Sequence, residues 1–118
     1  QEADRAIYAP IYRLLTSGED SEAWLLDLPC DTGTQRECHF TRTEKLTVLN
    51  GRITVRIENE VFKLSAGQQI NIAPGMAHTI ENHTHEVARI LEMRIGKILN
   101  DDDRLCVPEA KLYRSTAA

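Results

Sequence analysis

Short apolar runs separated by turn residues fill the chain between residues 23 and 93. The run at residues 69–72 alternates apolar and polar positions with a period of two, which is typical of a strand with one buried face. Together with similar runs it predicts strands over residues 23–28, 46–49, 53–57, 61–64, 69–72, 77–82 and 87–93. Turn signals recur about every eight to twelve residues, and this spacing predicts an all-β sandwich or barrel.

A β-hairpin is predicted at Asn50-Gly51, between the runs at residues 46–49 and 53–57. Both residues of this dipeptide accept a positive φ, so Asn-Gly is the strongest short-range signal for a two-residue hairpin turn. We therefore expect these two runs to pair with each other.

The two ends of the chain lack the central pattern. Pro10 interrupts any helix in residues 4–16 and favours an extended or kinked N-terminal arm. Residues 94–118 lose the alternation, which predicts an irregular C-terminal segment, a loop or short helix that wraps the barrel. Within it, the three consecutive aspartates at residues 101–103 predict a solvated acidic turn.

Size and composition predict one domain over residues 1–118, with a barrel core at about residues 22–96. The hydrophobic fraction of 42 % and the charged fraction of 27 % are typical of an ordinary soluble domain. A net charge of −4 provides no extended basic field, so nucleic acid is not an expected partner. No apolar stretch reaches the roughly 18 residues of a membrane span, so no membrane partner is expected either.

The cysteines indicate a reducing environment. Cys30, Cys38 and Cys106 are odd in number, widely spaced and without a CxxC pair. This pattern predicts neither a disulfide framework nor a cysteine zinc site, and a cytoplasmic location is the expectation that follows.

Two segments carry residue types that ligate metals. Glu37 and His39 are two positions apart, so on a strand both side chains leave the same face. Glu44 follows them, and His78 comes just after the turn at Pro74-Gly75, from which a strand can aim it into the interior. Imidazole and carboxylate ligands together suit a divalent first-row metal such as zinc, manganese, iron or nickel.

These two segments resemble the two motifs of the cupin superfamily, small β-barrels of jelly-roll topology. In the first, His39 precedes Glu44 with the expected spacing, and Glu44 precedes Gly51 by the expected interval. In the second, Gly75, His78 and Asn82 lie in register with the motif. The resemblance covers roughly residues 29–95 and implies a cupin jelly-roll barrel.

A closer resemblance is to the cupin domains of type II mannose-6-phosphate isomerases, which are often fused to a mannose-1-phosphate guanylyltransferase. Glu37-Cys38-His39 and Arg42-Thr43-Glu44 stand where that family has a glutamine, one residue and histidine, and then an Arg-x-Glu step. Residues 91–103 are similar to the ending of these domains, where a strand leads into a glycine, a leucine and a double acidic step.

The resemblance implies a metal site and an anion-binding group. The first cupin motif commonly has two histidines, and here Glu37 replaces one of them, so the implied ligands are Glu37, His39, Glu44 and His78. Two carboxylates make such a site harder, which favours manganese over copper. Arg42 and Arg36 are the candidates for holding a sugar phosphate, because guanidinium matches phosphate oxygens in bidentate fashion. Trp24 and Tyr12 are assigned to packing or to a dimer surface.

Three functions are compatible with this reading of the residues. The first is a metal-dependent enzyme similar to mannose-6-phosphate isomerase, in which the metal binds the C1 and C2 oxygens of an open-chain sugar phosphate. The second is a non-catalytic module that binds a sugar or another small ligand, and the third is a cupin dioxygenase. In each case we expect a small-molecule ligand and a homodimer formed by exchange of the N-terminal segment.

Overall fold

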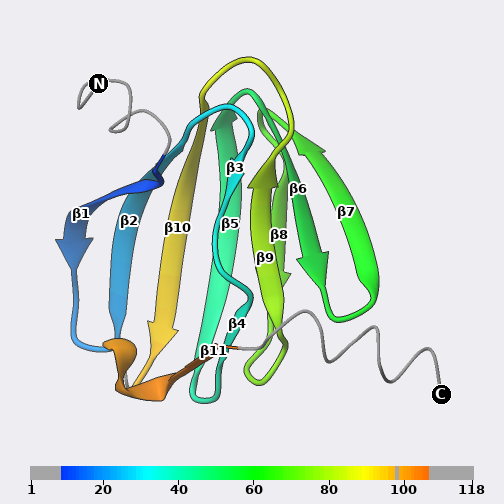
Figure 1. The fold of residues 1–118 in the computed structure, drawn as a ribbon. Helices are drawn as coiled ribbons and strands as arrows, with labels where there is room; N and C mark the ends of the chain where they lie inside the picture. The colour runs from blue at the N-terminus through cyan, green and yellow to red at the C-terminus, as the bar shows by residue number, and fades with distance from the viewer. Residues whose placement is uncertain (1–8, 98, 107–118) are drawn as a thin grey trace, which may run out of the picture.

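The chain folds into two antiparallel β-sheets that pack face to face (Figure 1). The computed structural model describes residues 9–97 and 99–106. The first sheet has the order β1 (Ile11–Ser17), β2 (Ser21–Leu28), β10 (Ala88–Gly96), β5 (Arg42–Asn50) and β8 (Gln69–Ile72). The second has the order β11 (Arg104–Cys106), β4 (Glu37–His39), β9 (His78–Asn82), β6 (Arg52–Ile57) and β7 (Glu60–Ser65), with β3 (Thr32–Gly33) also paired to β9. The all-β prediction is confirmed.

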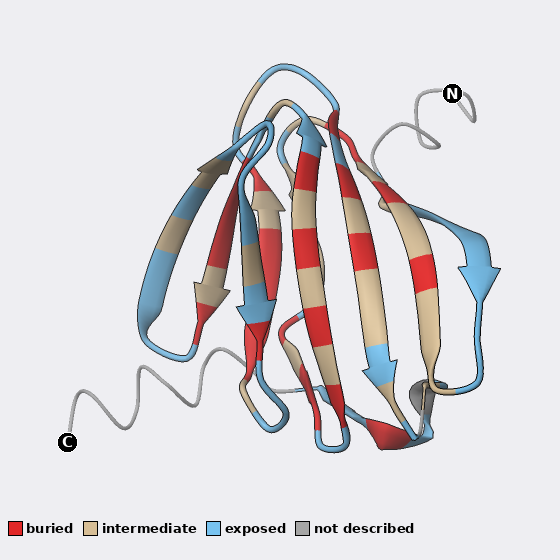
Figure 2. Cartoon of the chain, turned by 180° about the vertical axis from the view of Figure 1, so that it is seen from behind, coloured by how far each residue is buried: buried red, intermediate tan, exposed pale blue. Residues whose placement is uncertain are grey.

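The core lies between the sheets and is built by alternation along the strands. Figure 2 shows buried positions separated by more exposed ones along the central strands. The central strands carry apolar residues on one face, and burying that face against the opposite sheet supplies the main driving force for folding. The inward-facing apolar residues of this core are Leu26, Leu28, Leu46, Val48, Ile53, Val55, Ile57, Ile72, Ile80, Ala88 and Ile90.

The predicted hairpin at Asn50-Gly51 was wrong, although strands lie on both sides of it. β5 pairs with β10 and β8 in one sheet, whereas β6 pairs with β7 and β9 in the other. Gly51 does use a positive φ of 82°, so the dipeptide makes the sharp turn that its chemistry predicts. A turn signal is local, however, and it does not determine the pairing partner of each strand. Here β5 and β6 belong to opposite sheets, and each turns an apolar face toward the core between them.

The two-residue hairpin of this fold is the one that joins β6 to β7. Ile57 pairs with Glu60, so Glu58-Asn59 forms the connection. Glu58 adopts a positive φ of 53°, which matches the backbone twist that short hairpins require.

The N-terminal arm is extended over its described part. Residues 11–17 form β1, which pairs with β2 at one edge of the first sheet and leaves Ile11, Leu14 and Leu15 exposed. Residues 4–8 of the predicted arm lie outside the described residues. The homodimer formed by exchange of this arm stays a prediction.

The C-terminal segment is more ordered than its pattern predicts. β10 continues to Gly96, and a 3₁₀ turn at Asp101–Asp103 leads into β11, which pairs with β4. The prediction of a solvated acidic turn was wrong for Asp103, which is buried and accepts hydrogen bonds from the Thr41 backbone N–H (2.8 Å) and hydroxyl (2.7 Å). Those donors offset the cost of removing its carboxylate from water. Residues 107–118 of the segment lie outside the described residues.

The described residues contain no helix with the length and apolar character needed to cross a membrane.

Candidate metal centre

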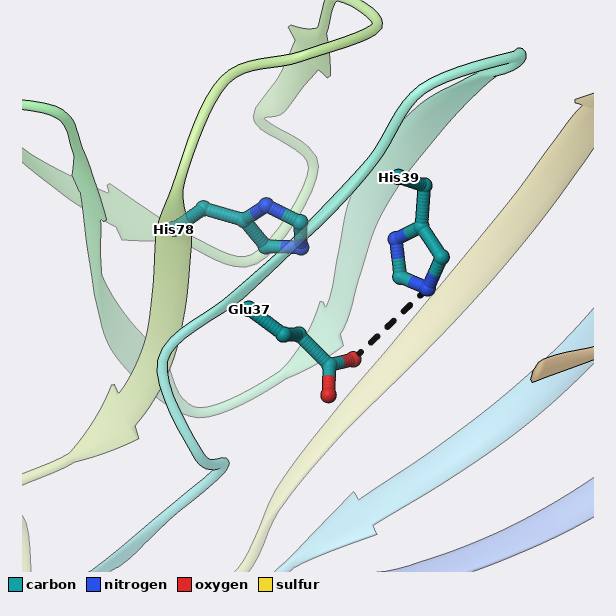
Figure 3. A group of neighbouring side chains, drawn as sticks. All are labelled: Glu37, His39 and His78. Atoms are coloured by element: carbon teal, nitrogen blue, oxygen red, sulfur yellow. Dashed lines mark ion pairs between the residues drawn. The ribbon is translucent and has the colours of Figure 1, made fainter. Parts of the chain in front are cut away.

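Two neighbouring strands bring Glu37, His39 and His78 together (Figure 3). Glu37 and His39 lie on the same face of β4, and β4 pairs with β9 so that Glu37 stands opposite His78. One donor atom from each side chain lies within 4.8 Å of the others. Figure 3 shows the carboxylate and the two imidazole rings turned toward a common space. A short backbone pairing therefore creates a three-donor cluster from residues far apart in the sequence.

His39 is a buried imidazole without a hydrogen-bond partner. Its side chain is 2 % exposed, and neither Nδ1 nor Nε2 makes a hydrogen bond in the described structure. The Glu37 Oε1 atom is 3.9 Å from Nε2, and the Glu44 Oε2 atom is 3.6 Å from Nδ1, so both are beyond hydrogen-bonding distance. Burial lowers the pKa of His39 to about 4, which leaves the ring neutral at pH 7.

An unsatisfied buried imidazole is costly, and it fits a metal ligand. Unpartnered polar groups in protein interiors are rare because each loses its hydrogen bonds to water. A neutral ring with a free lone pair beside a carboxylate and a second imidazole is the donor set of many zinc, manganese and iron sites. The residues present therefore fit a divalent metal ion at Glu37, His39 and His78.

His78 is oriented by hydrogen bonds at both ring nitrogens. The Met76 carbonyl accepts a hydrogen bond from Nδ1 at 3.0 Å, and Nε2 lies 3.1 Å from Glu44 Oε1. Burial opposes protonation, but the hydrogen bond and the charge of Glu44 outweigh it and raise the pKa of His78. The contact at Nδ1 fixes the ring so that Nε2 faces the cluster, which is the arrangement that protein metal sites use to hold a histidine ligand.

Glu44 lies beside both histidines but is also paired with an arginine. It projects from β5 of the first sheet, and its Oε2 atom accepts hydrogen bonds from Arg42 Nε (2.9 Å) and Nη2 (2.5 Å). The sequence predicted Glu44 as a fourth ligand, and its pairing with Arg42, two positions earlier on the same strand, was not predicted. In this structure the carboxylate holds the His78 ring and neutralises the buried Arg42.

The ionisation of Glu44 predicts acid sensitivity of the metal-free protein. Burial opposes its charge, but the hydrogen bond from His78 and the positive charge of Arg42 lower its pKa from 4.5 to about 2. A lowered folded-state pKa stabilises the protein above pH 4.5, and this contribution is lost as the pH falls toward 2. With chelator present, we expect the free energy of unfolding to fall across this window by a few kcal/mol.

Denaturant titrations between pH 6 and pH 2 measure this loss. The Glu44→Gln variant is expected to lack most of it, whereas Glu60→Gln, at an exposed position at the start of β7, keeps it. Parallel curves for wild type and Glu44→Gln contradict the prediction.

The donors of Arg42 are all used within the protein, whereas the Nε and Nη2 atoms of Arg36 are buried without a hydrogen-bond partner among the described residues, and Arg36 is not among the residues that line the cavity beside the cluster. Arg42 is 3 % exposed, and besides its bonds to Glu44 it donates from Nη1 to the Leu99 carbonyl at 3.0 Å. Arg36 is 8 % exposed, and its Nη2 atom lies 3.6 Å from Glu58 Oε2, at the turn between β6 and β7. Their substrate-binding roles stay predictions.

A cavity of about 610 Å³ adjoins the cluster, and Glu37 forms part of its wall. Of its lining residues the sequence predicted only Glu37 and Arg42 as site residues, and the charged or aromatic side chains of Tyr12, Trp24, Arg94 and Arg104 were not predicted. Alternate residues of β10 point toward the core. Because Ile90 and Glu92 are buried, Arg94, two positions further on, is expected to point inward as well. The complete lining comprises Pro10, Tyr12, Trp24, Gly33, Thr34, Gln35, Glu37, Arg42, Arg94 and Arg104.

The fold and the cluster together define a cupin. The two-sheet barrel matches a cupin-2 domain protein of Rhodospirillum rubrum with a TM-score of 0.77 and 17 % sequence identity, over 92 % of this chain and 72 % of that one. It also matches a protein of Acidithiobacillus ferrooxidans whose assignment as a sugar phosphate isomerase is provisional. That match has a TM-score of 0.67 and 19 % identity, over 75 % of this chain and 60 % of that one. At these identities the likeness shows the fold alone.

The chain belongs to the family described as mannose-6-phosphate isomerase C-terminal, which matches residues 2–108. Among curated proteins it is 26 % identical over 101 residues to a mannose-1-phosphate guanylyltransferase of Salmonella montevideo, covering 84 % of this chain and 21 % of that protein. The chain thus spans about a fifth of the length of the first curated relatives it matches. The family resemblance seen in the two motifs is confirmed.

Proposed function

We propose that this chain is a metal-dependent cupin that acts on a sugar phosphate, in the manner of a mannose-6-phosphate isomerase. The observation that carries the proposal is the buried His39 ring, neutral and unpartnered at both nitrogens, within a carboxylate–imidazole cluster. The adjoining cavity, with Glu37 in its wall, supports the approach of a small ligand to this side of the cluster. Membership of the isomerase C-terminal family supports the choice of substrate class.

Glu37, His39 and His78 would hold the metal, and either zinc, manganese, iron or nickel suits these donors. When bound, a divalent ion supplies Lewis-acid stabilisation of the charge that develops on sugar oxygens during enolisation. The protein's own contribution is orientation and charge balance. Met76 fixes the His78 ring through Nδ1, and Arg42 holds the Glu44 carboxylate beside it.

A binding module without catalysis is the second candidate, and the composition of the cavity wall favours it. Among the described residues that line the cavity, Glu37 is the one carboxylate, and it is itself a candidate metal ligand. A carboxylate bound to a metal is a poor proton acceptor, since the cation stabilises its charged form. The wall therefore offers no separate carboxylate for the proton transfer that isomerisation needs.

Incubation with fructose 6-phosphate, followed by proton NMR, distinguishes the two candidates. If the protein is an isomerase, mannose 6-phosphate forms when manganese or zinc is supplied, and chelation lowers the rate by at least about a hundredfold, because Lewis-acid stabilisation is worth several kcal/mol. Metal-dependent binding of fructose 6-phosphate without conversion supports the binding module. Neither binding nor conversion, in protein shown by elemental analysis to be metal-loaded, refutes both.

A further inference from the structure

Arg94 is held rigidly on the inner face of β10, beside the candidate metal centre. In the pairing of β10 with β5, Arg94 stands opposite Glu44, and Glu44 contacts both histidines. Its Nε atom donates to Glu92 Oε2 at 2.5 Å, and Glu92 is only 2 % exposed. Its guanidinium carbon, Cζ, lies 4.6 Å from the centre of the Trp24 ring, within the range of a cation–π interaction. One edge and one face of the group are therefore fixed by the protein.

The remaining edge of this guanidinium is available to a ligand. Within the described part of the chain, Glu92 is the one hydrogen-bond acceptor of Arg94, and it uses only Nε. The two terminal amino groups, Nη1 and Nη2, belong to a side chain that is 14 % exposed and lines the cavity. Arg42 lines the same cavity, but its Nε, Nη1 and Nη2 atoms all donate to Glu44 or Leu99. Arg94 thus differs from Arg42 in having Nη1 and Nη2 donors that no acceptor among the described residues uses.

A fixed guanidinium edge is well suited to an oxyanion. Two parallel N–H donors match two oxygens of a phosphate or carboxylate group, and a planar group that is already held in place loses little side-chain entropy on binding. Lysine cannot reproduce this arrangement, since its ammonium is a point charge on a flexible stem. Tyr12, whose ring centre lies 5.7 Å from the Arg94 guanidinium carbon, walls the same part of the cavity.

The charges around the cavity favour an anionic ligand once a cation is bound. Three ion pairs, Glu37–Arg104, Glu44–Arg42 and Glu92–Arg94, balance one another. A divalent ion would therefore leave an excess of positive charge, which a phosphate monoester or a carboxylate offsets.

We infer that Arg94 is the oxyanion-binding residue of this cavity, with Glu92 and Trp24 as the residues that position it. The inference deepens the proposed function, on which it rests only for the identification of the oxyanion as the phosphate of a sugar. The shared chemistry of the ligand is a phosphate or carboxylate group that receives two N–H donors from the Nη edge.

Calorimetric titration of manganese-loaded protein tests this role. The ligands are fructose 6-phosphate, unphosphorylated fructose, inorganic phosphate and gluconate, and the variant is Arg94→Lys. We expect this variant to bind fructose 6-phosphate about ten- to a hundredfold more weakly, the size of a lost hydrogen bond to a charged group, and fructose no more weakly than wild type does. Arg89→Lys is the matched control, because Arg89 is on the outer face of the same strand and pairs with Asp27.

Three results overturn the inference: unchanged binding in Arg94→Lys, equal weakening toward fructose, or no oxyanion binding by the metal-loaded wild type. If gluconate binds in an Arg94-dependent manner and fructose 6-phosphate does not, the oxyanion role stands and the sugar-phosphate proposal fails. Elemental analysis of each variant shows whether its metal is retained, so a failed centre is distinguished from a failed oxyanion site.

A second measurement does not depend on the folding of the variant. In ¹⁵N-labelled wild type, the side-chain Nε resonance of Arg94 is expected to shift on titration with fructose 6-phosphate, while that of Arg89 stays in place. A shift at neither residue, when calorimetry shows binding, overturns the assignment.

Discussion

Replacing His39 with alanine is expected to weaken manganese binding by at least about a hundredfold. Loss of a residue that merely orients a metal ligand already costs up to about a hundredfold, so loss of a ligand is expected to cost at least as much. His39 contributes a neutral, buried nitrogen that has no competing hydrogen bond, and alanine leaves only Glu37 and His78 of the three-donor cluster. Isothermal titration calorimetry of metal-free protein with manganese measures the change in affinity.

His83→Ala is the matched control for this experiment. His83 is exposed, and its Nε2 atom pairs with Glu81 Oε1 at 2.7 Å, away from the cluster. We expect this variant to bind manganese as the wild type does. Equal affinities of the His39 variant and the wild type would rule out His39 as a ligand and leave its unpartnered nitrogens without an explanation.

Replacing Arg42 with methionine is expected to lower the free energy of unfolding by about 3–5 kcal/mol. Breaking a buried ion pair leaves an uncompensated charge in the interior, and this penalty is much larger than the value of the pair at a surface. Arg42 and Glu44 are each 3 % exposed, so the remaining Glu44 carboxylate is not rescued by water. Chemical denaturation monitored by tryptophan fluorescence measures the loss, since Trp24 is the one tryptophan of the chain.

Two further variants separate the ion pair from other effects of the substitution. Arg56→Met breaks a pair with Glu81 in which the arginine side chain is 41 % exposed, and we expect it to cost less than about 1 kcal/mol. Adding Glu44→Gln to Arg42→Met removes the stranded charge and is expected to recover part of the stability. If Arg42→Met is as mild as Arg56→Met, Arg42 is not a structural partner of Glu44, and its predicted contact with substrate regains support.

The strands of this fold were readable from the sequence, but their pairing was not. Period-two alternation located β8 at residues 69–72, as predicted, because this strand turns one face toward the core. The sequence could not show that Asn50-Gly51 turns the chain from one sheet to the other, because φ preferences report only local geometry. The partners of β5 are β8 and β10, which follow it by many residues, so their pairing depends on the packing of the whole barrel.

The metal cluster could be predicted in part for the same physical reason. Spacing of two along a strand placed Glu37 and His39 on one face, and the turn before His78 pointed to the third donor. The pairing of Arg42 with Glu44 follows from the same spacing of two on one strand and could have been predicted. The contact of Arg42 with the Leu99 carbonyl could not, since Leu99 lies 57 positions away. Arg94 was not predicted because a charged residue near the end of a strand normally faces water. The alternation of buried residues along β10 shows that its side chain points inward instead.

Through its pairing with β4, strand β11 supports the strand that carries two donors of the candidate centre. β4 carries two of the three donors, and β11 lies along it with Arg104 opposite His39 and Cys106 opposite Glu37. Tension or docking applied to the chain just after Cys106 would pull on the strand that sets the spacing between those donors.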